Sequence, residues 1–379
     1  MKNVVNTSSM FYGCSSLVSI DTLKNWEMSD VQRTSDMFSG CSSLNSLEPI
    51  CDWNMENVEN VSKMFKNCTK ITSIEALKNW KMGNVTEMSG MFQGCSSLKT
   101  IEALQNWDIS KVNNLSNLFS GCVNLVSIDP LKNWEIKIVE TTSSMFSGCA
   151  NITSIEPLKN WKFLKVADTH NMFSGCSKIN SIDVVKNWKM TDVRNTNGMF
   201  FDCKNITTLD SLKNWDMSNV VNISNMFNGC CSLNSIDVLQ NWNIKNLKNC
   251  AGLFYGCSSI TSINALAKWD MSKVENASYM FCGCSSIKSI ESLKNWNTAK
   301  TKDMQYLFSD CTSLTSIEAL ANWNMSSVRS SCDMFNGCIK IENIDCLKNW
   351  DMSNNKYVHY MFYNCIGIKS IDALKNWNM

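Results

Sequence analysis

The chain has 379 residues, 44% of them hydrophobic, and its 35 Lys and Arg side chains nearly balance its 34 Asp and Glu side chains, for a net charge of +1. A charge this close to zero gives no overall field that would attract nucleic acid or an anionic membrane surface, so we predict neither as a partner. The chain has no run of about 18 apolar residues, so we predict no membrane insertion, and its first residues lack the apolar core of a secretory signal peptide.

The dominant feature of the sequence is a 27-residue repeat, present in 14 copies. All 14 tryptophans keep this interval, and no insertion or deletion breaks it. Fixed periodicity of this length is typical of solenoid proteins, in which a repeat too small to have its own core buries its apolar face against its neighbours. Cysteine also keeps the interval, at Cys14, Cys41, Cys68, Cys95, Cys122, Cys149, Cys176, Cys203, Cys230, Cys257, Cys284, Cys311, Cys338 and Cys365.

The first part of each repeat predicts a left-handed turn and a strand. In the copy from Met10 to Met28, Gly13 precedes the cysteine, and other copies have Gly, Asn or Asp there, the residues that best tolerate a positive φ angle. The segment Leu17–Asp21 follows, and its most regular positions carry Leu and Ile. We therefore predict one short parallel β-strand per repeat at this segment.

The second part of each repeat predicts two short helical turns on either side of an Asn-Trp corner. The first turn begins with an acid and continues as Leu-Lys-Asn-Trp, and Pro follows the acid at Pro49, Pro130 and Pro157. An acid at the start, Pro at the first position and Lys towards the end are typical of a helical turn. The second turn is predicted over residues 31–41, where apolar side chains are spaced for one face.

The repeated residues M-F-x-G-C-S-S-L-x-S-I-[DE]-x-L-x-N-W-x-M-S-x-V resemble the repeats of the BspA-like leucine-rich-repeat surface proteins over the whole chain. This chain departs from the shorter repeats of that family by one extra residue before the Asn-Trp pair (SIDTLKNW). The resemblance implies a right-handed leucine-rich-repeat-like coil, here of 14 repeats in a single domain over residues 1–379. It also implies display at the cell surface or secretion, adhesion, binding to host or matrix proteins, and no catalytic activity.

The repeated cysteines could bind metal, form disulfides or fill the interior. The close pairs Cys230–Cys231 and Cys282–Cys284 do not recur, and we interpret His170 and His359 as occupying different positions of the repeat, so we predict no metal site and no cofactor. Disulfides between adjacent coils would have nearly parallel Cβ bonds, which is poor geometry. We predict buried thiols, and expect any reactive cysteine among the six outside the repeat: Cys51, Cys231, Cys250, Cys282, Cys332 and Cys346.

An acid follows the predicted strand in every copy but one, and a small polar residue lies two positions before it. Stacked at strand spacing, these side chains would line one surface, and the acids could hold cations or a basic partner. In the interpretation that we favour, each acid instead begins a helical turn and is partly neutralised by a lysine three residues later, as in Asp21–Lys24. The candidate binding face consists of Ser19, Asp21, Ser46, Glu48, Ser73, Glu75, Glu102, Ser127, Asp129, Ser154, Glu156, Ser181, Asp183, Asp210, Ser235, Asp237, Ser289, Glu291, Ser316, Glu318, Asp345, Ser370 and Asp372.

The tryptophans could bind sugars or peptides if exposed, but their invariance within the repeat favours packing at the corner, with the indole N–H reaching a backbone carbonyl. The residue after Met-Phe varies instead, so a recognition surface can differ there from copy to copy. That position is occupied, for example, by Tyr12, Ser39, Lys66, Gln93, Phe201, Tyr255, Cys282 and Tyr363.

Nothing in the sequence predicts an enzyme, because it has no Gly-rich phosphate loop and no carboxylate pair that departs from the repeat. Our first hypothesis is a protein-binding module of adhesin or receptor type, exported as part of a larger surface protein. A structural spacer that displays another domain and an intracellular scaffold are the alternatives, and the missing signal leaves a cytoplasmic location open. The chain starts and stops in phase without recognisable polar caps, so we expect either a piece of a longer protein or end-to-end self-association.

Overall fold

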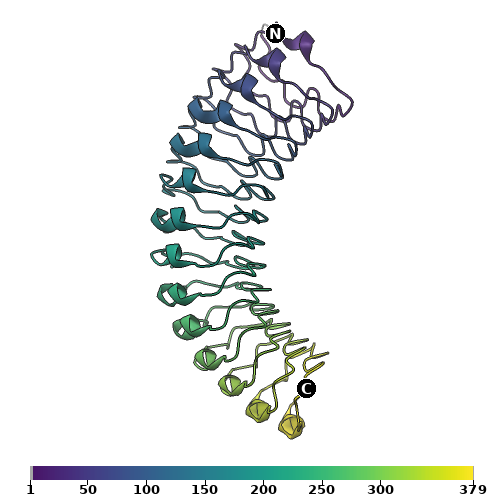
Figure 1. The fold of residues 1–379 in the computed structure, drawn as a ribbon, viewed down its shortest axis with the longest axis vertical. Coiled ribbons are helices and arrows are strands. Elements are labelled where there is room, and N and C mark those ends of the chain that lie inside the picture. Colours follow the sequence, from purple (N-terminus) through teal and green to yellow (C-terminus); the bar gives the residue numbers. More distant parts are fainter. Residues whose placement is uncertain (1–2, 379) are drawn as a thin grey trace. The chain divides into compact units, whose positions relative to one another are not determined.

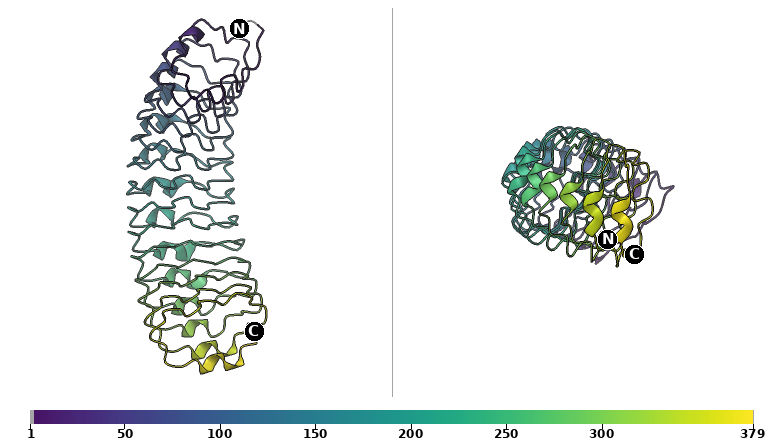
Figure 2. Two further views of the ribbon diagram at one scale, coloured as in Figure 1. Left: turned by 90° about the vertical axis from the view of Figure 1, so that its right-hand side faces the viewer. Right: turned by 90° about the horizontal axis from the view of Figure 1, so that it is seen from below.

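The structure is a computed structural model that describes residues 3–378, and it divides into two compact units between Asp192 and Val193. Each unit is a stack of coils, one for each repeat of the sequence. Figures 1 and 2 show one short helix per coil, so that each unit has a row of helices along one side and narrow turns along the opposite side. The prediction of a repeat solenoid is confirmed within each unit. The right-handed coil and the single domain over residues 1–379 stay predictions.

The helices are all 3₁₀-helices, and in the described residues each unit has seven of them. The first unit contains η1 (Asp21–Leu23), η2 (Glu48–Ile50), η3 (Glu75–Leu77), η4 (Glu102–Asn106), η5 (Asp129–Asn133), η6 (Glu156–Leu158) and η7 (Asp183–Asn187). The second contains η8 (Asp210–Leu212), η9 (Asp237–Asn241), η10 (Asn264–Lys268), η11 (Glu291–Leu293), η12 (Glu318–Leu320), η13 (Asp345–Asn349) and η14 (Asp372–Asn376). The predicted helical turn that begins with an acid is therefore confirmed. Among residues 3–378, no helix has the length and apolar character needed to cross a bilayer.

Main-chain hydrogen bonds join each coil to the next on the side opposite the helices. From residue 34 to residue 40, the N–H groups of even-numbered residues donate to carbonyls 26 residues later, at 2.7–2.9 Å. The N–H groups of Met37, Ser39 and Cys41 instead donate within the coil, to carbonyls three residues earlier. The same alternation recurs in the other coils of both units. The backbone therefore both folds each turn and fixes it against its neighbour.

The predicted left-handed position is confirmed in all 14 copies. Gly40 has a φ of 81°, and Asn67 and Asp310, which take its place in other coils, both have a φ of 58°. Over all copies this φ lies between 56° and 81°. The substitutions by Asn and Asp in the sequence therefore identified a real backbone requirement.

A second left-handed position lies four residues earlier and was missed. Asp36 has a φ of 57°, and its counterparts in all 14 copies lie between 53° and 61°, including bulky residues such as Lys63 and Tyr306. Left-handed residues at both positions break this segment into successive turns. The prediction of a helical turn over residues 31–41 is therefore wrong, although the apolar face that suggested it is buried.

Parallel β-bridges lie near these turns rather than in the predicted strand segment. They join Asn6, Arg33, Asn60, Glu87, Asn114, Thr141 and Asp168 in the first unit, and Asn195, Asn222, Asn249, Asn276, Asp303, Ser330 and Tyr357 in the second. In the described coils, the segment that corresponds to Leu17–Asp21 carries one bridge, Ser73 to Thr100, so the strand was predicted in the wrong place. The helices that follow this segment explain the difference. On the helical side, stacked tryptophan rings lie 6.0–6.4 Å apart, whereas paired strands require about 4.8 Å.

The core of each unit consists of files of one residue type stacked from coil to coil. Phe38 and Phe65 lie nearly parallel with centroids 5.7 Å apart, and Trp53 and Trp80 do so at 6.4 Å. The indole Nε1 of Trp53 donates to the carbonyl of Leu23 at 3.1 Å. Ten other tryptophans donate to the equivalent carbonyl, 30 residues earlier. The predicted corner packing of the tryptophans is confirmed.

Trp161 provides a natural comparison, because its buried Nε1 has no hydrogen-bond partner in the structure. Trp134, one coil earlier, donates to the Leu104 carbonyl at 3.1 Å. We expect Trp134→Phe to lower the free energy of unfolding by about 1–2 kcal/mol more than Trp161→Phe, since the first loses a buried hydrogen bond and the second removes an unsatisfied donor. Denaturant titration of both variants measures the difference, and equal destabilisation would contradict the assignment.

Candidate functional site

The predicted binding face of serines and acids is exposed or half-buried throughout. The hydroxyl of Ser127 accepts a hydrogen bond from the Asp129 N–H at 3.1 Å and donates to Asp129 Oδ2 at 2.7 Å. All ten serines of this face accept the same N–H bond, so they begin the 3₁₀-helices. The polar groups thus have a structural role, and binding by this face stays a prediction.

Among the described residues, the acids of this face that form an ion pair with the lysine three residues later are all glutamates. Glu75–Lys78, Glu156–Lys159 and Glu291–Lys294 have N–O distances of 3.3, 3.6 and 2.8 Å. Asp21 and Lys24 do not reach this distance in the described structure, because the shorter aspartate remains beside its own helix start. The predicted neutralisation by lysine is confirmed for these three glutamates. All six side chains are more than half exposed, so each pair adds little stability.

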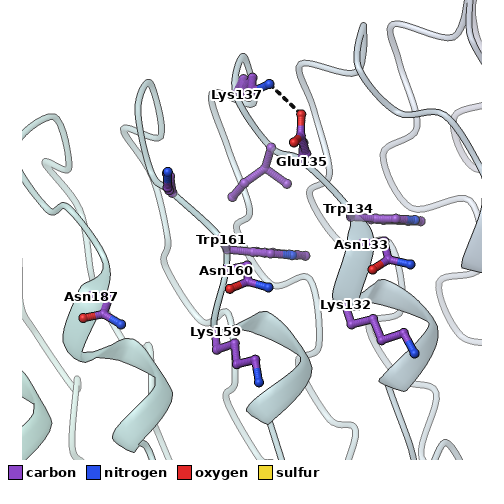
Figure 3. A pocket seen from close by; sticks show the side chains of 11 residues that line it. Lys132, Asn133, Trp134, Glu135, Lys137, Lys159, Asn160, Trp161 and Asn187 are labelled. Carbon is purple, nitrogen blue, oxygen red and sulfur yellow. Dashed lines mark ion pairs between the residues drawn. The ribbon is translucent and has the colours of Figure 1, made fainter.

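The Asn-Trp corners form shallow grooves between adjacent coils. Figure 3 shows one of them, where Lys132 and Lys159 lie in one file and Asn133 and Asn160 in another, and the indoles of Trp134 and Trp161 also line it. Similar grooves occur at other corners of the first unit. A groove that recurs with the repeat offers the same contacts many times, so it does not single out a specific site.

The repeated cysteines are buried thiols, as predicted, except Cys14 in the first coil, which is exposed. The Cys176 thiol donates to the Phe146 carbonyl at 3.2 Å, and eleven other repeated thiols reach the equivalent carbonyl, 30 residues earlier. Burial raises the pKa of Cys176 to about 12. Such thiols are protonated at neutral pH and poor nucleophiles, so this file fills the interior.

The six cysteines outside the repeat fall into two groups. Cys231 is exposed and Cys51 is half-buried, whereas Cys250, Cys282, Cys332 and Cys346 are buried. Burial raises the pKa of Cys250 to about 12. Of these six cysteines, we therefore expect only Cys231 and Cys51 to be reactive.

The clearest departure from the repeat is a group of tyrosines in the second unit. Six of the seven tyrosines of the chain lie between residues 255 and 363. Tyr279 and Tyr306 occupy the second left-handed position of successive coils, and their rings stack with centroids 4.6 Å apart. Further along, Tyr360 contacts Tyr363 edge to face at 5.7 Å, and Tyr357 is 56% exposed.

A basic column lies in the last three coils of the second unit, two of which also carry tyrosines. Lys302, Arg329 and Lys356 occupy the same position in three successive coils, all are exposed, and together they line a shallow pocket. Their main chains are joined, because the N–H of each later residue donates to the carbonyl of the earlier one at 2.8–2.9 Å. The next residue in each of these coils belongs to the bridge file that ends at Tyr357. We call these three basic residues, together with Tyr279, Tyr306, Tyr357, Tyr360 and Tyr363, the aromatic–basic surface.

Sequence reasoning found only part of this surface. Tyr255 and Tyr363 lie at the variable position after Met-Phe, which was predicted to differ between copies, and both are exposed. Tyr279, Tyr306 and Tyr360 were missed because the second left-handed position was not recognised. The available signal was the concentration of tyrosine in one part of the chain.

The second unit also contains a group of three side chains of the kinds that bind metal ions. Cys332, Asp333 and His359 place a thiol sulfur, a carboxylate oxygen and a ring nitrogen within 4.8 Å of one another. The interpretation that His170 and His359 occupy different repeat positions is wrong, because seven whole repeats separate them in the sequence. The two differ in surroundings: His170 Nδ1 lies 2.8 Å from the Asp168 carboxylate.

Comparison with known proteins gives a family match over the whole chain. The model of the family described as "Mycoplasma protein of unknown function, DUF285" matches residues 1–100, 69–184, 179–292 and 285–379. No curated protein matches the chain.

Several solved structures are similar to the chain. A leucine-rich repeat protein from Bacteroides ovatus is 18% identical over 89% of this chain and 81% of its own, with a TM-score of 0.37. A leucine-rich cell surface protein from Faecalibacterium prausnitzii is 17% identical over 89% and 77%, with a TM-score of 0.37. A leucine-rich repeat protein from Eubacterium ventriosum is 12% identical over 98% and 83%, with a TM-score of 0.36.

The buried thiols predict a loss of stability at alkaline pH. The pKa of Cys176 is about 12 in the folded chain against an ordinary value of 9.0, so above pH 9 the unfolded chain releases a proton that the folded chain keeps. The free energy of unfolding should therefore fall as pH rises from 9 towards 12, by up to about 1.4 kcal/mol per pH unit for each such thiol. Denaturant titrations across this range measure the slope. Cys176→Ala should reduce it by one thiol's share, and equal slopes in the wild type and this variant would contradict the prediction.

Proposed function

Because this chain belongs to the family described as "Mycoplasma protein of unknown function, DUF285", we propose its function from its own surface: it is a non-enzymatic protein-binding module. The aromatic–basic surface is its main contact site. The observation that carries the proposal is the break in the repeat, since the second unit contains six of the seven tyrosines and a column of three exposed basic residues. We keep the serine–acid face as a second candidate contact surface.

The composition of the aromatic–basic surface fits protein recognition. Tyr and Arg are enriched at protein interfaces and among the residues that contribute most to affinity, because a tyrosine ring covers a large area with few rotatable bonds. The exposed rings of Tyr357 and Tyr360 provide such contacts, and Tyr306 is already stacked on Tyr279 before any partner binds. Side chains held in place before binding lose less conformational entropy on association.

The basic column indicates the charge of the partner. Lys302 has an ion pair with Glu275 at 2.6 Å, whereas Arg329 and Lys356 have no ion pair in the described residues. Two cationic side chains without ion pairs, one of them next to the exposed Tyr357 in sequence, favour a protein segment that carries carboxylates next to apolar or aromatic residues. Such charges increase the rate of association and select among partners more than they add affinity.

We place this binding at the cell surface, where adhesion to host or matrix proteins is the proposed role. The resemblance of the repeats to BspA-like surface proteins supports this location. A structural spacer would need no local exception to the repeat, so the aromatic–basic surface argues against that alternative. An intracellular scaffold would use the same surface, and only the location of the protein separates the two.

The contact site is tested by parallel capture with four forms of the full chain. We expect a host-cell or matrix protein retained by the wild type to lose at least about tenfold in affinity with Tyr360→Ser or Arg329→Ser, since loss of a central aromatic or Arg contact typically costs about 1.4 kcal/mol or more. Tyr12→Ser is the matched control, because Tyr12 is 64% exposed and lies in the other unit. Quantitative mass spectrometry of the retained proteins and surface plasmon resonance with the best candidate give the measurement.

Two results of that experiment would count against the proposal. A partner retained equally by all four forms would move the contact away from the aromatic–basic surface, and Glu291→Gln with Glu318→Gln would then test the serine–acid face. Retention of no protein above a mock column would favour the spacer.

The location is tested on intact cells that express the protein. A membrane-impermeant amine reagent should label Lys302 and Lys356, which are exposed, if the module is displayed outside the cell. Labelling that occurs only after lysis would favour the intracellular scaffold, and a cytoplasmic protein that stays unlabelled in intact cells provides the control.

A further inference from the structure

We propose that Cys332, Asp333 and His359 form a binding site for a zinc ion. Their donor atoms lie within 4.8 Å of one another, and Cys332 and His359 occupy the same position of two successive coils. The proposal does not depend on the protein-binding function, because it concerns a ligand that the isolated chain can bind.

The Asp333 carboxylate lacks a partner that a cation would supply. Asp333 is only 3% exposed. Its Oδ1 accepts a hydrogen bond from Asn336 Nδ2 at 2.8 Å, but its Oδ2 has none in the described structure. A buried carboxylate oxygen without a partner is costly, and buried charges in native proteins are hydrogen-bonded, paired with an opposite charge or bound to a metal.

The Tyr306 hydroxyl lies close to the same carboxylate but does not replace a cation. A tyrosine phenol is uncharged at physiological pH, because its ordinary pKa is about 10. No hydrogen bond of acceptable geometry joins the hydroxyl to Oδ2. A neutral neighbour leaves the charge of the carboxylate uncompensated.

The backbone brings the three donors together. The Asp333 N–H donates to the His359 carbonyl at 3.0 Å, and the Tyr306 N–H donates to the Cys332 carbonyl at 2.9 Å. Asp333 has a φ of 56°, which aspartate tolerates better than most residues. These are the bonds that join every coil to the next, so the site is built into the regular frame and differs from other coils only in its side chains.

The two remaining side chains can adjust to an ion. The Cys332 thiol is 5% exposed and donates a weak hydrogen bond to Gln305 Oε1 at 3.5 Å. The His359 ring is exposed and lies edge-on to Tyr357 and Tyr360, with centroids 6.5 and 5.6 Å away. Rotation of the exposed imidazole would close the last part of the gap to the ion.

The donor types select zinc. One thiolate, one imidazole and one carboxylate suit Zn²⁺, whereas Ca²⁺ and Mg²⁺ prefer all-oxygen sites. Zinc bonds of about 2.0–2.3 Å in a tetrahedron place donor atoms roughly 3.3–3.8 Å apart, so the group must contract by about 1 Å. The ion would bind the sulfur as the thiol releases its proton to solvent, and the fourth position would hold water or a group from a partner.

The full chain, stripped with chelator and dialysed under reducing conditions, is titrated with Co²⁺ and then with Zn²⁺. We expect one Co²⁺ per chain with a near-ultraviolet charge-transfer band from the thiolate, lost when Zn²⁺ displaces it. Cys332→Ser should abolish the band, and Asp333→Asn and His359→Asn should each weaken binding by at least about tenfold. Asn tolerates a left-handed backbone, so Asp333→Asn should keep the fold, and circular dichroism checks this.

Matched controls separate this site from other cysteines and histidines. The band should persist in a chain carrying Cys14→Ser, Cys51→Ser and Cys231→Ser. These three are the cysteines that are exposed or half-buried in the described structure. It should also persist in His170→Asn, since His170 is paired with Asp168 in the other unit. Absence of binding by the wild type, or a band that survives Cys332→Ser, would overturn the proposal. Neither result would affect the capture experiment.

Discussion

The structure depends on one set of interactions, the main-chain hydrogen bonds that join each coil to the next at a fixed offset of 26 residues. Because the offset is fixed, an inserted residue would separate every later donor in that coil from its acceptor. The absence of insertions in the sequence is therefore a requirement of the backbone. A side chain at any position must then lie against its counterpart in the next coil, which is why residue types form files. The files of cysteine, phenylalanine and tryptophan follow from this register.

The same register solves the problem of polar atoms in the interior. The Trp53 indole and the Cys41 thiol each donate to a carbonyl 30 residues earlier, one repeat plus one turn away. A turn carbonyl already accepts a main-chain N–H, and its second lone pair is free for the side chain of the next coil. Buried indoles and thiols are thus hydrogen-bonded at little cost. Their regularity reflects packing, and a row of identical thiols in the interior has no access to substrate.

Much of the fold could be predicted because its requirements restrict residue type. The left-handed position at Gly40 was recognised since only Gly, Asn and Asp replace it. The equivalent backbone conformation at Asp36 was missed since Lys63 and Tyr306 share it, and there the main-chain bonds on both sides impose the conformation that residue type did not reveal. The strand was misplaced because apolar alternation reports burial, whereas pairing depends on the distance between coils. That distance is set by helices elsewhere in the repeat.

The site was harder to predict, because it lies where the side chains depart from the repeat and no repeated residue type marks it. A left-handed backbone costs a non-glycine residue about 1–2 kcal/mol, and an exposed tyrosine regains little of this by packing. Tyr360 is 63% exposed at such a position, and Asp333, one coil earlier, is buried there with an unpaired carboxylate oxygen. Main-chain hydrogen bonds hold this conformation in coil after coil, and all 14 copies share it, so the backbone strain alone does not mark the site. The signal that distinguishes the site is therefore the side chain at this position, an exposed tyrosine in one coil and a buried carboxylate with an unpaired oxygen in the coil before it.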